Sequence, residues 1–263
     1  MGNIYTGDRD DRATKTEYLE KRLEINRAYS SSDFNAWLFG HLDVKRGEDV
    51  LDVGCGSGAQ TLPFADMVGS EGSVSALDIA AESIDLLKSR VKPGTNVEAI
   101  VSDMAETGRH ITDTFTVKKY DLAHAAYSLY YCLEREKVLD AMRGALKPGG
   151  RVAIFNPNAP HGLVELASRH TEIPEPVLAS LEFGPKVLEP YFKRAFGTYE
   201  VHLFHNVVTL PSSDLMLEFY RQTTYHEPKA EEGMKAEVDA AIERDGSWSY
   251  EKNGYLIIGR DPK

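Results

Sequence analysis

One acid and three glycines, at regular spacing, are the residues of this chain best suited to hold a nucleoside. Asp52 stands two residues before Gly54, and Gly56 and Gly58 follow at spacing two. The apolar residues around Asp52 predict a buried strand, and Asp78 ends the next apolar run. A strand, a glycine turn, a helix and a second strand ending in an acid form the nucleoside-binding half of an α/β sheet. The spacing of the glycines decides which nucleoside cofactor is held.

The central part of the chain alternates between strand and helix patterns. The pattern predicts strands at 49–53, 73–77, 97–101, 120–126 and 151–155, and helices at 59–68, 81–90 and 134–146. Strands that alternate with helices at this spacing imply right-handed βαβ units and a parallel sheet. Later strands are predicted at 199–210 and 254–259 and suggest an antiparallel edge. We therefore expect an α/β fold with helices on both faces of a mostly parallel sheet.

The segments outside this alternation read as helical covers. A loose helical pattern runs from Glu17 to Tyr29, and Asp33 is placed to cap a second helix through Leu42. We expect residues 1–46 to form an N-terminal helical cap and residues 47–263 the main domain. Insertions near 157–184 and 211–250 are predicted to form a lid.

Composition narrows the possible partners. A net charge of −11 disfavours nucleic acid as a partner, because binding to phosphates needs a basic surface. No apolar run reaches the length of a membrane helix and the N-terminus is polar, so we expect a cytoplasmic protein. Cys55 and Cys132 form no CxxC pair, and the histidine spacing predicts no metal site. The oligomeric state is not readable from these patterns.

Four segments, taken in order, resemble one family. The turn at 54–58 reads GxGxG, with alanine at position 59, whereas the dinucleotide fingerprint is GxGxxG. Asp78-Ile79, Ser102-Asp103-Met104 and Lys147-Pro148-Gly149-Gly150 then follow at fitting intervals. Residues 47–156 therefore resemble the class I S-adenosylmethionine-dependent methyltransferases of the small-molecule type. The resemblance implies a Rossmann-like, mostly parallel seven-stranded sheet with an antiparallel edge strand.

The resemblance also implies a cofactor site for S-adenosylmethionine. It places the glycines against the methionine part, Asp52 near the sulfonium, and Asp78 on the ribose, since a carboxylate has two acceptor oxygens. Asp103 would accept from the adenine amino group, with Ile79 and Met104 on either side of the ring. The cofactor-binding residues expected from the resemblance are Tyr29, Asp52, Gly54, Gly56, Gly58, Asp78, Ile79, Asp103, Met104 and Ala125.

The reacting end is expected where the fourth strand ends. Tyr127, Tyr130 and Tyr131 would share one face of a following helical turn, where many relatives carry a histidine or an acid. His161 lies in the segment after the fifth strand, where such sheets carry sites. We take Tyr127, Tyr130 and His161 as candidate catalytic residues. The alternative for the tyrosines is plain packing under the lid.

Methyl transfer from a sulfonium is an in-line displacement at carbon. Bringing the nucleophile close and aligned can supply roughly 7–11 kcal/mol, and a base is needed only if the nucleophile must lose a proton. The expected function is S-adenosylmethionine-dependent methyl transfer to an oxygen, nitrogen or carbon of a small molecule. Two alternatives stay open: a nicotinamide-dependent oxidoreductase on a similar sheet, and a catalytically silent cofactor-binding domain.

Overall fold

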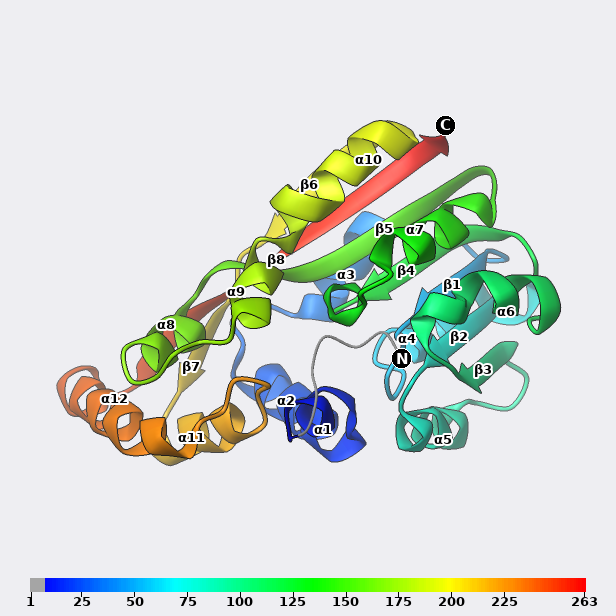
Figure 1. Ribbon diagram of the computed structural model, residues 1–263. Coiled ribbons are helices and arrows are strands. Elements are labelled where there is room, and N and C mark those ends of the chain that lie inside the picture. Colours follow the sequence, from blue (N-terminus) through cyan, green and yellow to red (C-terminus); the bar gives the residue numbers. More distant parts are fainter. Residues whose placement is uncertain (1–7) are drawn as a thin grey trace.

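The computed structural model describes residues 8–263 (Figure 1). Within that range one sheet holds eight strands, seven of them in the order β3-β2-β1-β4-β5-β8-β6, with β7 paired to β8. The strands are β1 Asp49–Val53, β2 Ser73–Asp78, β3 Val97–Val101, β4 Tyr120–Ala126, β5 Leu146–His161, β6 Phe196–Phe204, β7 Val207–Leu210 and β8 Trp248–Pro262. Strands β1 to β5 pair in parallel, and β8 runs antiparallel to β5, β6 and β7. The expected Rossmann-like sheet with an antiparallel edge is confirmed, but within the described residues it has eight strands rather than seven, because β7 pairs separately with the long β8.

The helices follow the order of the strands along the chain. They are α1 Asp8–Thr14, α2 Thr16–Tyr29, α3 Phe34–Leu42, α4 Thr61–Val68, α5 Ala81–Arg90, α6 Thr107–Asp113, α7 Arg135–Gly144, α8 Gly162–Ser168, α9 Glu175–Leu181, α10 Glu189–Ala195, α11 Ser213–Arg221 and α12 Glu231–Asp245. Asp33 caps α3 as expected, because its side chain accepts a hydrogen bond from the Ala36 N–H.

Alternation along the strands divides the core between the two faces of the sheet. Leu51 and Ala123 point to one face and pack with α6, α7 and α10. Val50 and Leu122 point to the other face and pack with α3 and α4. Helices therefore cover both faces, as the sequence predicts. The strand order reverses between β1 and β4, which is where a ligand crevice is expected in such sheets.

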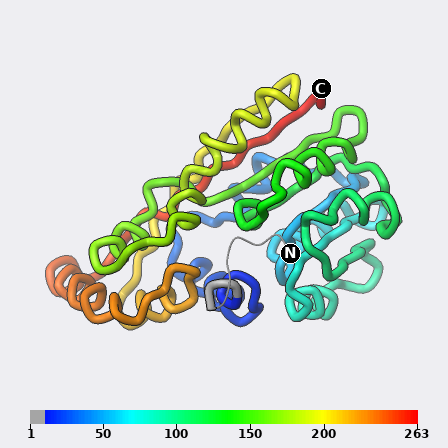
Figure 2. The backbone as a smooth tube through the Cα atoms, in the orientation of Figure 1, coloured from blue at the N-terminus to red at the C-terminus, as the bar shows by residue number. Residues whose placement is uncertain are grey.

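Strands β5 and β8 are much longer than their sequence predictions. They run on together past the parallel strands, as the long diagonal pair in Figure 2 shows. At their far end α8, α9, α11, α12 and β7 share a separate hydrophobic cluster with Ile25 of α2, which we call the cap core. Its members come from residues 157–184 and 211–250, from β7 and from the N-terminal helices. The division into domains stays a prediction.

Two segments differ locally from their predicted form. The strand expected at 199–210 is broken into β6 and β7 around Asn206, whose N–H donates to the Asn253 side chain at 3.2 Å. The turn expected at 147–150 lies inside the start of β5, where Gly149 has a φ of 79°. Positive φ is easy only for glycine, so this position bends the strand as it enters the sheet.

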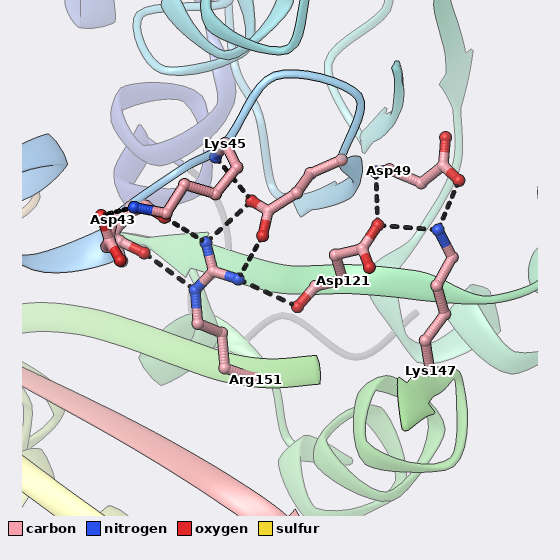
Figure 3. A network of polar contacts seen from close by, with 8 residues as sticks. Asp43, Lys45, Asp49, Asp121, Lys147 and Arg151 are labelled. Atoms are coloured by element: carbon pink, nitrogen blue, oxygen red, sulfur yellow. Dashed lines mark hydrogen bonds and ion pairs between the residues drawn. The ribbon is translucent and has the colours of Figure 1, made fainter. Parts of the chain in front are cut away.

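A polar network closes the end of the sheet where β1 and β4 begin (Figure 3). The Arg151 guanidinium donates to both Glu48 carboxylate oxygens at 2.9 Å and to the carbonyls of Leu42 and Asp43. Lys147 donates to Asp49 at 2.8 Å and to Asp121 at 2.7 Å. The lysine of the expected family turn is therefore a clamp between strands, at the end away from the glycine turn.

No helix within residues 8–263 is long and apolar enough to cross a membrane. The cytoplasmic location stays a prediction.

Candidate cofactor and substrate cavity

A cavity of about 630 Å³ lies where the parallel strands end. One side is formed by the segments that follow β1, β2, β3 and β4. The other side is formed by α2, the end of α11 and the part of β8 that belongs to the cap core. The cavity therefore joins the end of the Rossmann-like sheet to the cap.

The glycine turn is built so that a larger residue cannot replace the first two glycines. Gly54 has a φ of 74° and Gly56 a φ of 51°, in the region that favours glycine. A Cβ at Gly54 would lie 2.4 Å from the Cβ of Ser128, and one at Gly56 would lie 2.8 Å from Leu19 Cδ2. Both glycines line the cavity, so the main chain itself forms its wall.

Asp78 is fixed against this turn by two main-chain hydrogen bonds. Its Oδ2 accepts from the Gly56 N–H at 2.8 Å, and its Oδ1 accepts from the Ala80 N–H at 2.9 Å. Burial raises the pKa of Asp78, and the two N–H groups act against that rise. Each carboxylate oxygen keeps a lone pair for a further donor. The side chain lines the cavity and is preorganised to accept hydroxyl groups.

The next two segments supply a polar group and an apolar surface. Asp103 caps the 3-10 turn Met104–Glu106 by accepting from the Ala105 N–H at 2.9 Å, and it also lines the cavity. Ile79 and Met104 line the cavity, and Ile79 is 46% exposed. An exposed large apolar side chain at a cavity wall is suited to a flat ring.

Helix α2 is held over the glycine turn. Leu19 reaches Gly56, and the Ser57 hydroxyl donates to Glu20 at 2.5 Å. Arg90 of α5 pairs with the same Glu20 carboxylate at 2.7 Å. Burial acts to raise the pKa of Glu20, but the bonds from Arg90 and Ser57 outweigh it and hold the pKa below its usual value. Helix α2 is thus part of the cavity wall.

The end of β4 supplies aromatic groups. Tyr127 has a φ of 52°, an uncommon conformation for a bulky residue that points to a local constraint. Its ring packs on Phe155 and Phe34, with centroids 4.9 Å and 5.6 Å away. A 3-10 turn follows at Leu129–Tyr131, and Tyr127, Tyr130 and Tyr131 all line the cavity. Burial raises the pKa of Tyr127, so its hydroxyl stays protonated at neutral pH.

His161 lies at the cap end of the cavity, opposite Lys252 in the β5–β8 register. Within the described chain its buried Nδ1 has no hydrogen-bond partner. Burial and the nearby Lys252 lower the pKa of His161 to about 3. Such a weak base is poorly matched to proton abstraction at neutral pH. A role as general base is therefore disfavoured, whereas a role in contacting a ligand stays a prediction.

Most of the residues predicted from the sequence come together around the cavity. Those that line it are Gly54, Gly56, Asp78, Ile79, Asp103, Met104, Tyr127, Tyr130 and His161. Four others, Tyr29, Asp52, Gly58 and Ala125, are not among the lining residues.

The positions of these four residues in the fold explain why they do not line the cavity. Tyr29 lies one helical turn after Ile25 and packs with it in the cap core, whereas Leu19 and Asn26 face the cavity. Ala125 shares the strand face of Ala123 and is buried under α7. The next residue, Ala126, lines the cavity instead.

Asp52 and Gly58 serve the surrounding structure. Asp52 is buried and accepts from the Thr61 hydroxyl at 2.6 Å, and its other oxygen lies 3.0 Å from His124 Nδ1. It therefore ties β1 to α4 and β4, behind the cavity wall. A Cβ at Gly58 would lie 2.5 Å from Leu87 Cδ1, so this glycine lets α5 approach the turn.

Sequence reasoning missed the cap side of the cavity. Arg22, Asn26 and Lys252 line it, yet the terminal strand was expected to begin only at residue 254. The available signal was a single lysine two residues after Tyr250 and three before Tyr255. A basic residue set among buried aromatic positions of a strand deserves the same scrutiny as a buried acid.

These features define an α/β protein that binds a nucleoside cofactor at the end of its parallel strands. Residues 50–150 match the model of a methyltransferase domain. Residues 50–150 therefore carry a methyltransferase domain, in line with the motifs of the class I S-adenosylmethionine-dependent methyltransferases that this region resembles.

The chain is also similar in sequence to individual methyltransferases. The chain is 28% identical over 140 residues to the demethylmenaquinone methyltransferase of Lactobacillus johnsonii, covering 52% of this chain and 56% of that protein. It is 34% identical over 113 residues to the aklanonic acid methyltransferase DauC of a Streptomyces species, covering 42% and 49%. The chain thus spans about half the length of these relatives.

A solved structure extends the likeness to the fold of the whole chain. The S-adenosylmethionine-dependent methyltransferase of Thiobacillus denitrificans, solved with S-adenosylhomocysteine, aligns with a TM-score of 0.50 at 16% identity. The alignment covers 98% of this chain and 100% of that one.

The residues at the cavity fit the cofactor of this class. The turn admits no Cβ at Gly54, Gly56 has the positive φ that favours glycine, the Asp78 carboxylate has acceptor capacity to spare, and Ile79 offers an uncovered apolar surface. Within residues 8–263, no group of three or more histidine, cysteine or acidic side chains is placed to hold a metal ion.

Proposed function

We propose that this protein transfers a methyl group from S-adenosylmethionine to a small-molecule acceptor enclosed in the cavity. One observation carries the proposal: a single cavity is lined both by the cofactor residues Gly54, Asp78 and Asp103 and by the aromatic residues Tyr127 and Tyr130. A small molecule is favoured over nucleic acid because the chain has a net charge of −11.

The cofactor half assigns a task to each side chain. Asp78 would accept from the ribose hydroxyls, and Asp103 would accept from the adenine amino group. Ile79 and Met104 would flank the ring. When bound, S-adenosylmethionine supplies a methyl group that its positive sulfur already activates. The protein then has to hold the acceptor in line with that methyl group.

The chain's own groups favour catalysis by enclosure and alignment. Proximity and orientation can supply roughly 7–11 kcal/mol of the barrier. Helix α2, latched to the turn through Glu20 and Ser57, would exclude water from the reacting atoms. Burial raises the pKa of Tyr127 and of Cys55, so neither is placed to act as a base at neutral pH.

We propose that the acceptor is a planar aromatic compound. Tyr127, Tyr130, Tyr131, Phe219 and Tyr225 all contribute to the cavity wall. Flat rings stack well against such side chains. Relatives named for demethylmenaquinone and for aklanonic acid support this class of acceptor.

An assay of methyl transfer tests this proposed function. The purified protein is incubated with S-adenosylmethionine and a panel containing 1,4-dihydroxynaphthalene, 1,4-dihydroxy-2-naphthoate and aliphatic amines, and S-adenosylhomocysteine is quantified by mass spectrometry. We expect product with at least one aromatic compound, and clearly less product with Asp78→Asn at a subsaturating cofactor concentration. Cofactor binding without turnover across a broad aromatic panel would favour the silent-domain alternative. Hydride transfer with NADH would favour the oxidoreductase.

A further inference from the structure

Two cations at the cap side of the cavity lack an acidic partner. Lys252 Nζ donates to the Asn26 side-chain oxygen at 2.7 Å and lies 5.1 Å from the centre of the Phe219 ring. Arg22 Nη1 donates to the carbonyls of Arg12 at 2.9 Å and Gln222 at 2.7 Å. In the described part of the chain neither cation pairs with a carboxylate.

Elsewhere this protein neutralises its enclosed cations directly. Arg151 is buried and has the Glu48 carboxylate on two of its nitrogens, and Lys147 lies between Asp49 and Asp121 (Figure 3). A cation taken out of water is costly unless it is paired, and this fold follows that rule at the base of its sheet. Lys252 and Arg22 at the cavity differ, because neither has a carboxylate partner among the described residues.

Three acids line the cavity: Asp33, Asp78 and Asp103. Asp78 and Asp103 follow β2 and β3 and accept main-chain N–H groups there, and Asp33 caps α3 by accepting from the Ala36 N–H. Asn26, which holds Lys252, lies seven residues along α2 from Leu19 at the glycine turn, about 10 Å at 1.5 Å per residue. Asp78 at the glycine turn therefore lies away from Lys252, and Asp33 is engaged as a helix cap.

The hydrogen-bond donors of Arg22, near Lys252, suit a carboxylate group. Arg22 Nε and Nη2 have no hydrogen-bond partner among the described residues, and two parallel guanidinium donors match a carboxylate. His161, opposite Lys252 in the strand register, adds a buried Nδ1 that is also unpartnered there. The lysine and the guanidinium thus lack a negative partner, and the neutral imidazole opposite the lysine adds a buried polar atom without a hydrogen-bond partner among the described residues.

We propose that Lys252, with Arg22 beside it, binds a carboxylate of the acceptor and so selects aromatic acids as substrates. This inference rests on the proposed methyl transfer for the word acceptor, although the anion site itself does not. The carboxylate acts as an anchor, and the ring of the acceptor would extend toward Tyr130 and the glycine turn.

The test compares 2-naphthoate with 2-naphthamide, its neutral isostere, by calorimetric titration with and without saturating S-adenosylhomocysteine. For the wild-type protein we expect naphthoate to bind at least about tenfold more tightly, the effect of a hydrogen-bonded charge. Lys252→Met should abolish this preference, and Lys252→Arg should keep most of it. Lys88→Met, which changes an exposed lysine on α5, serves as the matched control and should behave as wild type.

Each other result has a definite meaning. Equal binding of the two probes to the wild type, or an undiminished preference in Lys252→Met, would overturn the inference. Loss of S-adenosylhomocysteine affinity in Lys252→Met would also overturn it, because the lysine would then belong to the cofactor. If the wild type discriminates the probes but binds no S-adenosylhomocysteine, the anion site stands and the proposed methyl transfer fails.

Discussion

Three aspartates that lie near the ends of successive strands have three different environments. Asp52 is satisfied by Thr61 and His124 behind the cavity wall. Asp78 rests on two main-chain N–H groups at the glycine turn, and Asp103 caps a 3-10 turn. Of these three only Asp78 and Asp103 line the cavity, so we predict that these two acids bind the ligand.

Replacing Asp78 tests this assignment. Asp78→Asn keeps the shape but turns one acceptor oxygen into a donor, so the affinity for S-adenosylhomocysteine should fall by about 10- to 100-fold. Calorimetric titration measures the affinity, and circular dichroism checks the fold. Asp66→Asn, on the exposed side of α4, is the control. Unchanged affinity in Asp78→Asn would remove this residue from the site.

Lys252 gives the ligand-free protein a distinct pH dependence. Burial, and then Arg22, lower its pKa from 10.5 to about 7. Between these values the unfolded chain binds more protons, so the free energy of unfolding rises with pH. Burial raises the pKa of Tyr225 and lowers the pKa of His161, so both stay neutral from pH 7 to 9 and neither adds a titration there.

Removing the lysine should flatten that dependence. Relative to wild type, Lys252→Met should lose about 1–2 kcal/mol of the rise in unfolding free energy between pH 7 and pH 9. Urea unfolding at both pH values measures it, with Lys88→Met as the control. Parallel pH profiles for wild type and Lys252→Met would contradict the burial of an unpaired lysine.

At the scale of elements, α2 is the part of the cap that touches both halves of the site. Its residues Leu19 and Glu20 hold the glycine turn, and Asn26 holds Lys252. The sequence predicts this helix, but its weak apolar pattern does not say which face covers the cavity. Tyr29 packs against the cap core and is not among the residues that line the cavity, so its role in cofactor binding stays a prediction.

The latch between α2 and the turn can be opened selectively. Glu20→Ala removes the acceptor of both Ser57 and Arg90, so S-adenosylhomocysteine should bind about 3- to 10-fold more weakly and dissociate faster. Stopped-flow fluorescence would follow the dissociation. Glu24→Ala changes a mainly exposed acid on the same helix and should leave the rate unchanged. The same rate in both variants would show that α2 is not a latch.

The network at the base of the sheet supports stability rather than binding. Arg151→Met leaves Glu48 without its partner, and breaking a buried ion pair costs about 3–5 kcal/mol of unfolding free energy. Adding Glu48→Gln should recover part of that loss. Urea unfolding measures both, and S-adenosylhomocysteine affinity should not change. A loss below about 1 kcal/mol, as for the exposed Arg109→Met, would contradict this role.

The element predictions were best where local pattern and burial agree. Strands 97–101 and 120–126 and helix 81–90 have the predicted bounds, because each belongs to the regular βαβ part of the chain. Strands β5 and β8 were underestimated. Their outer parts contain Pro157, Pro160 and Asn253 and are extended because each pairs with the other, a long-range effect that no local pattern carries.

For the whole molecule, the Rossmann-like sheet and the cap lie along one pair of long strands, β5 and β8 (Figure 1). Residues from both halves line one cavity. The sheet half contains the segment that matches a methyltransferase domain. The cap half is assembled from α2, α8, α9, α11, α12 and β7, which are distant in sequence, so its Lys252 and Arg22 could not be assigned to a site before the fold was known.

The most direct test of the central claim is the thermal unfolding of the full chain with S-adenosylhomocysteine and with NADH. A ligand that binds only the folded state at 100 times its Kd stabilises it by about 2.7 kcal/mol. We predict that S-adenosylhomocysteine raises the melting temperature by several degrees and that NADH leaves it unchanged. Stabilisation by NADH alone, or by neither compound, would contradict the assignment of the glycine turn to the methyl donor.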